Sequence, residues 1–233
     1  LLEDAWNGTG QFEGTEPIRG FGAVAGVYEE ACQIVVRADS EISTVEELEG
    51  HRVSVGEEES GTKQNALQIL AAYGLNEKLV EEVSLNYTEA AKELENGSID
   101  AFFCTAGAQT AAIANLAQRT GIRFLNVDGA AAARLKKSYP VYDSCIIAAG
   151  TYPGQEEDVS TVGVKAVLLA SDSVSAEVVE ELTALLFEEQ QELDFALPVE
   201  LITEADAAAD GISVPFHKGA ERYYESRGEK SEN

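Results

Sequence analysis

The chain has 233 residues, with 42 acidic side chains against 16 basic ones and a formal net charge of −26 at pH 7. This length is sufficient for one large domain or two ordinary ones, each with a buried core. A field this negative repels phosphate backbones and anionic membrane surfaces, so nucleic acid is not expected as a partner.

Strands and helices alternate along the first two thirds of the chain. The β-branched run at residues 34–37 predicts a strand, and a short helix capped by Ser43 or Thr44 follows, with Glu46 or Glu47 placed for a capping box. The further predicted elements are a strand at 52–55, a helix at 62–73, a strand at 83–87, a helix at 88–95, a strand at 99–104, a helix at 108–119, a strand at 122–127 and a helix at 130–137. This rhythm predicts an α/β protein with a parallel sheet.

The last third of the chain has a different pattern. Residues 145–149 and 162–170 form long β-type runs, and residues 174–193 predict a long amphipathic helix. Residues 1–6 resemble the middle of a helix. No long flexible linker separates these parts, so we expect a domain boundary at strands that cross between two lobes.

A glycine loop at residues 56–63, with the sequence GEEESGTK, is one transposition away from a phosphate-binding loop. Thr62 precedes Lys63 where the pattern requires the reverse, and three glutamates would oppose a triphosphate, so we reject a nucleotide site. The loop follows a predicted strand and opens a predicted helix. Backbone N–H groups at Ser60, Gly61 and Thr62 could therefore hold a carboxylate or phosphate. The alternative is an ordinary helix cap by Ser60 or Thr62.

A second loop, with Thr105, Ala106 and Gly107, also lies between a predicted strand and a predicted helix. Ligands of open α/β sheets bind beyond the carboxyl ends of strands, so both loops could face one crevice. The alternative is a tight turn of small residues. A third candidate is Tyr152 with Gln155, whose ring and amide could cover a small polar ligand.

Residues that could carry catalysis are sparse. His51 and His217 have no nucleophile at a recognisable spacing, and paired glutamates such as Glu180 and Glu181 lie on a predicted helix face. The cysteines lack metal-ligand spacing, and two of them, Cys104 and Cys145, sit in apolar runs typical of buried side chains. We therefore expect neither an enzyme nor a cofactor or metal.

Several segments together resemble the TAXI-type solute receptors, the substrate-binding proteins of one class of TRAP transporters. Their order and spacing along the chain carry the resemblance. The segments are AWNGTGQFEG at residues 5–14, VRADS at 36–40, LEGHRVSVG at 48–56, SGT at 60–62 with Asn65 and Ala66, FFCTAG at 102–107, AGTYPGQ at 149–155 and VPFHKGAERYY at 214–224.

The resemblance implies a two-lobed fold of the type II periplasmic-binding-protein kind, with central sheets flanked by helices. Residues 1–37 would belong to lobe one, residues 38–145 to lobe two, and residues 146–233 would return to lobe one and add the C-terminal helices. The receptor would be extracytoplasmic, in the periplasm or anchored at the cell surface, and would deliver a small carboxylate or an acidic amino acid such as glutamate to TRAP membrane permease subunits. The ligand-binding residues expected on this template are Ser60, Gly61, Thr62, Asn65, Thr105, Ala106, Gly107, Tyr152 and Gln155.

The start of the chain differs from this family pattern. Members begin with a glycine-rich strand, loop and helix, followed by another βα unit, before the segment that corresponds to residues 5–14. We therefore expect the N-terminal part of the family domain to be missing and lobe one to be incomplete. Two alternatives to a working receptor are an enzyme of cofactor biosynthesis on the same fold and a binding-incompetent fragment.

Overall fold

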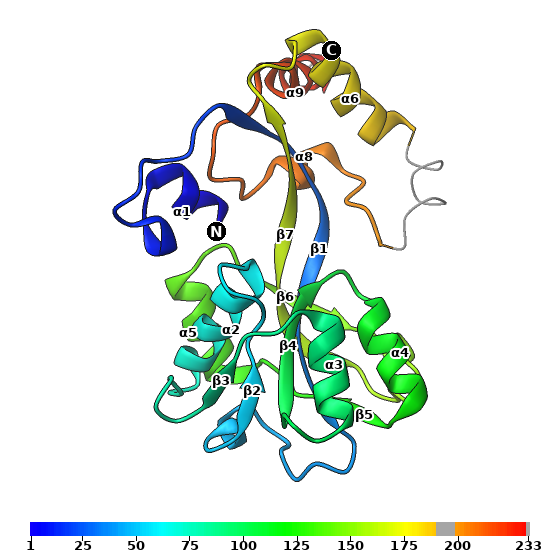
Figure 1. The fold of residues 1–233 in the computed structure, drawn as a ribbon. Coiled ribbons are helices and arrows are strands. Elements are labelled where there is room, and N and C mark those ends of the chain that lie inside the picture. Colours follow the sequence, from blue (N-terminus) through cyan, green and yellow to red (C-terminus); the bar gives the residue numbers. More distant parts are fainter. Residues whose placement is uncertain (190–198, 232–233) are drawn as a thin grey trace. The chain divides into compact units, whose positions relative to one another are not determined.

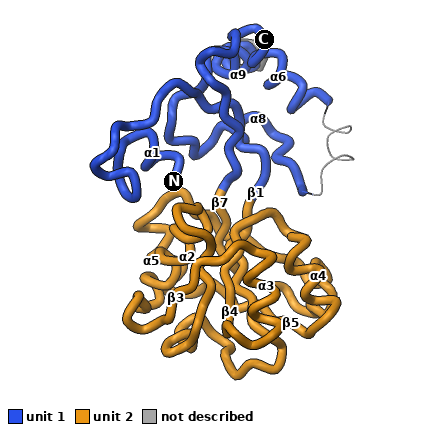
Figure 2. The backbone as a smooth tube through the Cα atoms, in the orientation of Figure 1, with its two compact units in different colours: residues 1–29, 165–233 blue, residues 30–164 orange. Residues whose placement is uncertain are grey.

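The computed structural model describes residues 1–189 and 199–231 and shows an α/β protein whose central sheet is flanked by helices (Figure 1). The predicted fold class is confirmed. Two compact units divide the chain: residues 1–29 and 165–233 form unit 1, and residues 30–164 form unit 2 (Figure 2). Within the described ranges, no helix combines the length and apolar character that a membrane span requires.

The chain passes between the units inside two long strands, β1 (Phe21–Arg37) and β7 (Val159–Ser171). The division therefore falls at 29/30 and 164/165, whereas the sequence predicted lobe boundaries at 37/38 and 145/146. The difference arises because the second half of β1 and the first half of β7 belong to the core of unit 2. Ile34 and Val162, for example, are buried in the same apolar cluster.

Across the described residues, seven strands form one sheet in the order β3-β2-β4-β1-β7-β6, and β5 pairs with β1. Besides β1 and β7, unit 2 contains the following elements: η2 Glu46–Leu48, β2 Arg52–Ser54, α2 Gly61–Ala72, β3 Glu81–Val83, α3 Tyr87–Glu95, β4 Ala101–Ala106, α4 Ala111–Arg119, β5 Ile122–Phe124, α5 Gly129–Ser138 and β6 Asp143–Ile147.

The predicted parallel sheet is wrong in part, because the sheet is mixed. The helix-connected strands β2, β3 and β4 pair in parallel, but β1 runs antiparallel to β4 and β5, and β6 runs antiparallel to β7. The chain leaves β1 at Arg37 and returns through the short 3₁₀ helix η2 instead of a crossover helix. Strand β2 therefore starts in the opposite direction to β1.

Side chains alternate between the two faces of this sheet, as the geometry of a strand requires. Ile34 and Phe103 pack into one apolar cluster with buried residues of α2 and α5. Val35 and Phe102 pack into a second cluster with buried residues of α3 and α4. Figure 1 shows these helix pairs on opposite faces of the sheet. Unit 2 is therefore a three-layer α/β/α structure with a core on each face.

Most predicted helices of unit 2 are confirmed, with α2, α3 and α5 within a residue of the expected bounds. The predicted strand at 83–87 is wrong, because β3 ends at Val83 and Asn86 caps α3 by accepting a hydrogen bond from the backbone N–H of Glu89. The capping box expected near Ser43 and Thr44 is confirmed in part: the Glu47 carboxylate accepts hydrogen bonds from both of their backbone N–H groups, but no side chain caps the start of η2.

Helix α4 begins at Ala111, three residues later than predicted. Gln109 has a positive φ of 66°, which a helix cannot accommodate, and the backbone N–H of Thr110 is bound by the Tyr152 hydroxyl. The second loop is therefore longer than expected, and Ala108 lies in the loop and outside the helix.

In unit 1, the ends of β1 and β7 are accompanied by α1 (Leu2–Asn7), η1 (Gly10–Phe12), α6 (Ala176–Glu188), α8 (Ala205–Ala209) and α9 (Lys218–Ser231). Helix α9 packs on α6 through Gly219, where an added Cβ would lie 2.3 Å from the Ala176 carbonyl oxygen. The helix expected at the first six residues is confirmed as α1. The helix expected at 174–193 corresponds to α6, and the last part of that prediction lies outside the described residues.

Candidate functional site

The start of α2 is built by Gly56 and Ser60. Ser60 is the N-cap: its Oγ accepts from the backbone N–H of Lys63 across 3.1 Å and donates to the Glu57 carbonyl oxygen across 2.7 Å. Gly56 has a φ of +98°, and an added Cβ would lie 2.8 Å from the Thr62 Cγ2 atom. The loop is thus a capped helix start, and the helix itself does not use the N–H groups of Gly61 and Thr62.

Thr62 is joined to the end of β4 by a residue that the sequence did not indicate. The Thr62 Oγ1 atom lies 2.6 Å from the Tyr87 hydroxyl oxygen, and that hydroxyl lies 2.9 Å from the Thr105 carbonyl oxygen. Thr62 is 6% exposed, so little of it faces solvent. Tyr87 is the first residue of α3, and it therefore links two helix starts to one strand end.

Asn65, one turn further along α2, makes a second link to β4. Its side-chain N–H group donates to the Thr105 hydroxyl across 3.3 Å, and its oxygen accepts from the Tyr142 hydroxyl across 2.9 Å. The Thr105 hydroxyl in turn donates to the Cys32 sulfur. Burial raises the pKa of the Cys32 thiol to about 12, so this sulfur stays protonated at neutral pH. The structure therefore brings Thr62, Asn65 and Thr105 together.

The other predicted residues lie around a neighbouring network. Gln33 of β1 donates to the Ala106 carbonyl oxygen across 3.5 Å, and the Gly107 carbonyl oxygen accepts from the Thr110 hydroxyl across 2.9 Å. Tyr152 is 1% exposed and donates from its hydroxyl to the Gln33 side-chain oxygen across 2.6 Å. Tyr152 thus reaches the end of β4 through Gln33, and the loop after β4 through the backbone N–H of Thr110.

Gln155 contacts the second network at the backbone of Tyr152, whose N–H donates to the Gln155 side-chain oxygen across 3.2 Å. Its side-chain N–H group donates to the carbonyl oxygens of Ile147, Ala148 and Glu157, which closes the turn that it belongs to. Among the hydrogen bonds described, this side chain is used within its own turn. No hydrogen bond of the described residues joins it to Thr62 or Thr105.

A cavity of about 90 Å³ lies between the starts of α2 and α3, lined by Glu57, Ser60, Thr62, Leu85, Asn86 and Tyr87. Among the three loop glutamates, Glu57 lines this cavity. Glu58 is held elsewhere, because Lys63 Nζ and Ser84 Oγ contact its carboxylate across 2.7 and 2.6 Å. The hydrogen bond from Lys63 is the main reason why the pKa of Glu58 is lowered.

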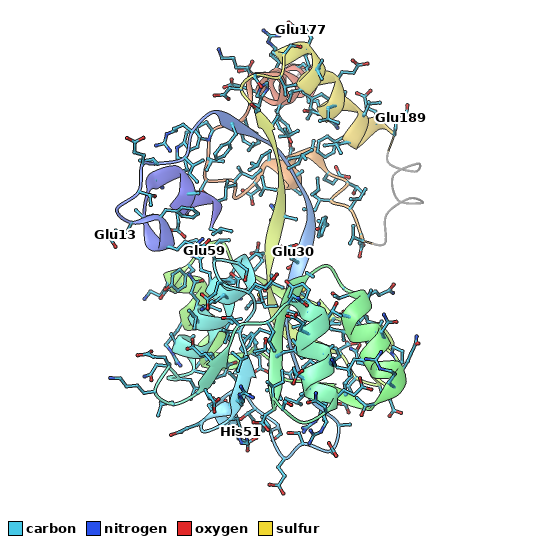
Figure 3. All side chains as sticks on the ribbon, in the orientation of Figure 1. Glu13, Glu30, His51, Glu59, Glu177 and Glu189 are labelled. Atoms are coloured by element: carbon cyan, nitrogen blue, oxygen red, sulfur yellow. The ribbon has the colours of Figure 1, made fainter. Side chains whose placement is uncertain are left out.

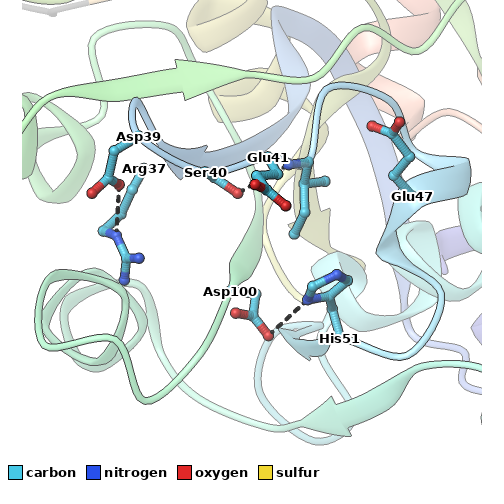
Figure 4. A pocket seen from close by; sticks show the side chains of 8 residues that line it. Arg37, Asp39, Ser40, Glu41, Glu47, His51 and Asp100 are labelled. Atoms are coloured by element: carbon cyan, nitrogen blue, oxygen red, sulfur yellow. Dashed lines mark hydrogen bonds and ion pairs between the residues drawn. The ribbon is translucent and has the colours of Figure 1, made fainter.

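A larger open pocket of about 500 Å³ lies at the amino ends of β2 and β4 (Figure 4), lined by Arg37, Asp39, Ser40, Glu41, Ile42, Glu47, His51 and Asp100. Four of its polar side chains form two pairs: Arg37 Nε lies 3.0 Å from Asp39 Oδ1, and His51 Nδ1 lies 3.2 Å from Asp100 Oδ2. Figure 3 shows His51 and Glu59 at opposite ends of unit 2. Excess acid here disfavours an anion, and in the described part of the chain no group of His, Cys, Asp or Glu side chains is arranged to hold a metal ion.

The second histidine has a structural role. His217 is buried in unit 1, and its Nδ1 accepts a hydrogen bond from the backbone N–H of Gly219 across 3.2 Å. The other histidine, His51, is half-buried and contacts the Asp100 carboxylate. Cys104 is buried as predicted, whereas Cys145 is only partly buried.

Solved structures that the chain matches include solute-binding proteins. The aliphatic sulphonate binding protein SsuA from Escherichia coli is 19% identical, with a TM-score of 0.44, over 76% of this chain and 53% of that one. An ancestral arginine-binding protein bound to glutamine is 17% identical, with a TM-score of 0.39, over 87% of this chain and 63% of that one. A TctC solute binding protein from Polaromonas is 15% identical, with a TM-score of 0.46, over 81% of this chain and 64% of that one. The chain thus spans less than two thirds of the length of each.

The chain is thus an α/β protein with a mixed central sheet flanked by helices. A model of the NMT1-like family, which is periplasmic-binding-protein-like, matches residues 1–228. The chain therefore belongs to the NMT1-like family.

Proposed function

We propose that this chain is the extracytoplasmic solute-binding component of a TRAP-type secondary transporter, of the TAXI kind. It captures a small carboxylate or an acidic amino acid such as glutamate and delivers it to the TRAP permease subunits in the membrane. Membership of the NMT1-like family supports a solute-binding role, and the ordered segments from residues 5–14 to 214–224 favour the TAXI kind.

The observation that carries this proposal is the chain of contacts from Thr62 through Tyr87 to Thr105, with Asn65 beside it. These contacts tie the start of α2 to the carboxyl end of β4, which is where ligands bind in open α/β sheets. The N–H groups of Gly61 and Thr62 are donors at the positive end of a helix, and a carboxylate is the partner that such an end stabilises.

A net charge of −26 does not prevent an anion from binding there. Donors act on the carboxylate at contact distance, whereas exposed acids are screened beyond about 8 Å in physiological salt. Two acids could interfere: Glu57 lines the cavity, and, after burial, the charge of Glu30 is among the causes that raise the pKa of Tyr87. The carboxylate of Glu58 is already held by Lys63 and Ser84. The proposed site therefore depends on local donors and tolerates the acidic surface.

Differential scanning fluorimetry of this chain against small carboxylates and amino acids tests the proposal. A ligand that binds only the folded state stabilises it by about 2.7 kcal/mol at a concentration one hundred times its Kd. We expect glutamate or a related carboxylate to raise the Tm of the parent chain and of Glu58→Gln, and to raise that of Thr62→Val much less. If no carboxylate or amino acid raises the parent Tm, the proposed function is wrong.

A further inference from the structure

The hydrogen atoms in the Thr62–Tyr87–Thr105 chain can be assigned from the chemistry of its members. A carbonyl oxygen only accepts, so the Tyr87 hydroxyl must donate its single proton to the Thr105 carbonyl oxygen. The contact of 2.6 Å between Tyr87 and Thr62 then requires Thr62 to be the donor. The Thr62 hydroxyl therefore donates its proton to the Tyr87 oxygen and presents only lone pairs to the cavity.

The protonation state of Tyr87 is compatible with this assignment. Burial, the largest cause, raises the pKa of Tyr87 to about 12, although the hydrogen bond from Thr62 lowers it. The phenol therefore keeps its proton at neutral pH. The neighbouring hydroxyls are committed in the same way: Ser60 donates to the Glu57 carbonyl oxygen, and Thr105 donates to the Cys32 sulfur.

The cavity beside Thr62 is small, about 90 Å³, and has room for a charged group of a solute. Besides Thr62 it is lined by Glu57, an acidic residue. Both residues favour a hydrogen-bond donor that carries positive charge, such as an ammonium group.

We propose that Tyr87 is a positioning residue that fixes Thr62 as a hydrogen-bond acceptor, and that the group of the solute beside Thr62 is an ammonium. The proposal rests on the solute-binding function proposed above and narrows its ligand class to amino acids over plain carboxylates. A carboxylate of the same solute is left to the backbone N–H groups of Gly61 and Thr62. Removal of the Tyr87 hydroxyl frees the Thr62 proton and makes Thr62 a donor to anions.

Calorimetry with L-glutamate and glutarate, which differ only by the amino group, tests this selectivity. The measured quantity is the ratio of the two affinities in the parent, Tyr87→Phe, Thr62→Val and the double variant. A hydrogen bond to a charged group corresponds to about a tenfold to hundredfold change in affinity, so we expect Tyr87→Phe to lower the glutamate preference by at least about tenfold. Thr62→Ser keeps the hydroxyl and should keep the parent ratio.

The double variant separates positioning from a merely structural role. If Tyr87 acts through Thr62, then Tyr87→Phe changes the ratio in the parent but not in the Thr62→Val background. An equal change in both backgrounds, or an unchanged ratio in Tyr87→Phe, would overturn the proposal. Glu57→Gln measures the contribution of the cavity charge on its own and should lower the ratio in both backgrounds.

Two smaller probes decide the case in which neither dicarboxylate binds the parent, which would count against the proposed function. Methylammonium and acetate are titrated while the backbone amide signals of residues 60–63 are followed by NMR. The proposal predicts that methylammonium shifts these signals in the parent more than acetate does, and that the order reverses in Tyr87→Phe. The same order in both proteins would overturn it.

Discussion

The side-chain amide of Asn65 on α2 donates to the hydroxyl of Thr105 at the end of β4, with 3.3 Å between nitrogen and oxygen. Forty residues separate the two positions in the sequence, and each lies on an element that packs against its own part of the core. The contact is possible because β2 and β4 are parallel neighbours. Their carboxyl ends therefore meet at one edge of the sheet, where the polar cluster forms.

The apolar face of α2 should contribute strongly to stability. Leu70 is buried against the sheet, whereas Leu67 on the same helix is 37% exposed. We expect Leu70→Ala to lower the free energy of unfolding by about 2–5 kcal/mol, because truncation of a buried side chain leaves a cavity. Leu67→Ala is the matched control and should cost much less. Urea denaturation measures both, and equal losses would show that this face is not the core side of α2.

The cap at Ser60 should be separable from ligand binding. Ser60→Ala removes the oxygen that accepts from the backbone N–H of Lys63, and we expect a loss of about 1 kcal/mol in the free energy of unfolding. Ser60→Asp retains an acceptor at the N-cap and should be close to the parent. A Ser60→Ala variant as stable as the parent would mean that the cap is not formed in solution.

Gly56 should tolerate no side chain. An alanine there would adopt a φ of +98° and would place its Cβ 2.8 Å from the Thr62 Cγ2 atom. Gly154 is the control, because it has a φ of +78° but nothing within 4 Å of an added Cβ. We expect Gly56→Ala to destabilise unit 2 more than Gly154→Ala, and the difference in urea midpoint measures the steric part alone. Equal urea midpoints for the two variants would mean that the Thr62 side chain does not crowd position 56.

Low pH should reduce the free energy of unfolding, in part because Glu47 becomes protonated. The backbone N–H of Ser43, the largest cause, holds the pKa of Glu47 below its usual value of 4.5. A group with a lowered folded-state pKa stabilises the protein above its unfolded pKa, and that contribution is lost as the pH falls through the folded pKa. Glu47→Gln should therefore reduce the loss of stability below about pH 4.5, measured by urea denaturation across that range. A slope identical to that of the parent would contradict the assignment, and Glu49→Gln is the control.

Local signals in the sequence were sufficient for α2 and its loop. The apolar stripe at Ala66, Ile69 and Leu70 and the stop at Gly74 place the helix within one residue of its observed bounds. The direction of β1 could not be predicted in the same way. It depends on how the chain turns back after Arg37, where a short 3₁₀ helix replaces a crossover helix.

Tyr87 was missed for a different reason. Val83, Leu85 and Tyr87 alternate with polar residues, and such alternation is typical of a strand. Asn86, a favourable N-cap residue, was the available signal that a helix begins at Tyr87. The hydrogen bonds that Tyr87 makes to Thr62 and Thr105 span 25 and 18 residues, and no spacing rule in the sequence predicts them.

The most direct test of the proposed site is an NMR titration of the backbone amides of the intact chain with L-glutamate. We expect the largest shift changes at residues 60–62 and 105–107, at the start of α2 and the end of β4. Small changes at His51 and Asp100, which line the larger pocket at the other end of unit 2, serve as the internal reference. Changes centred on His51 and Asp100, with residues 60–62 unaffected, would contradict the assignment of the site.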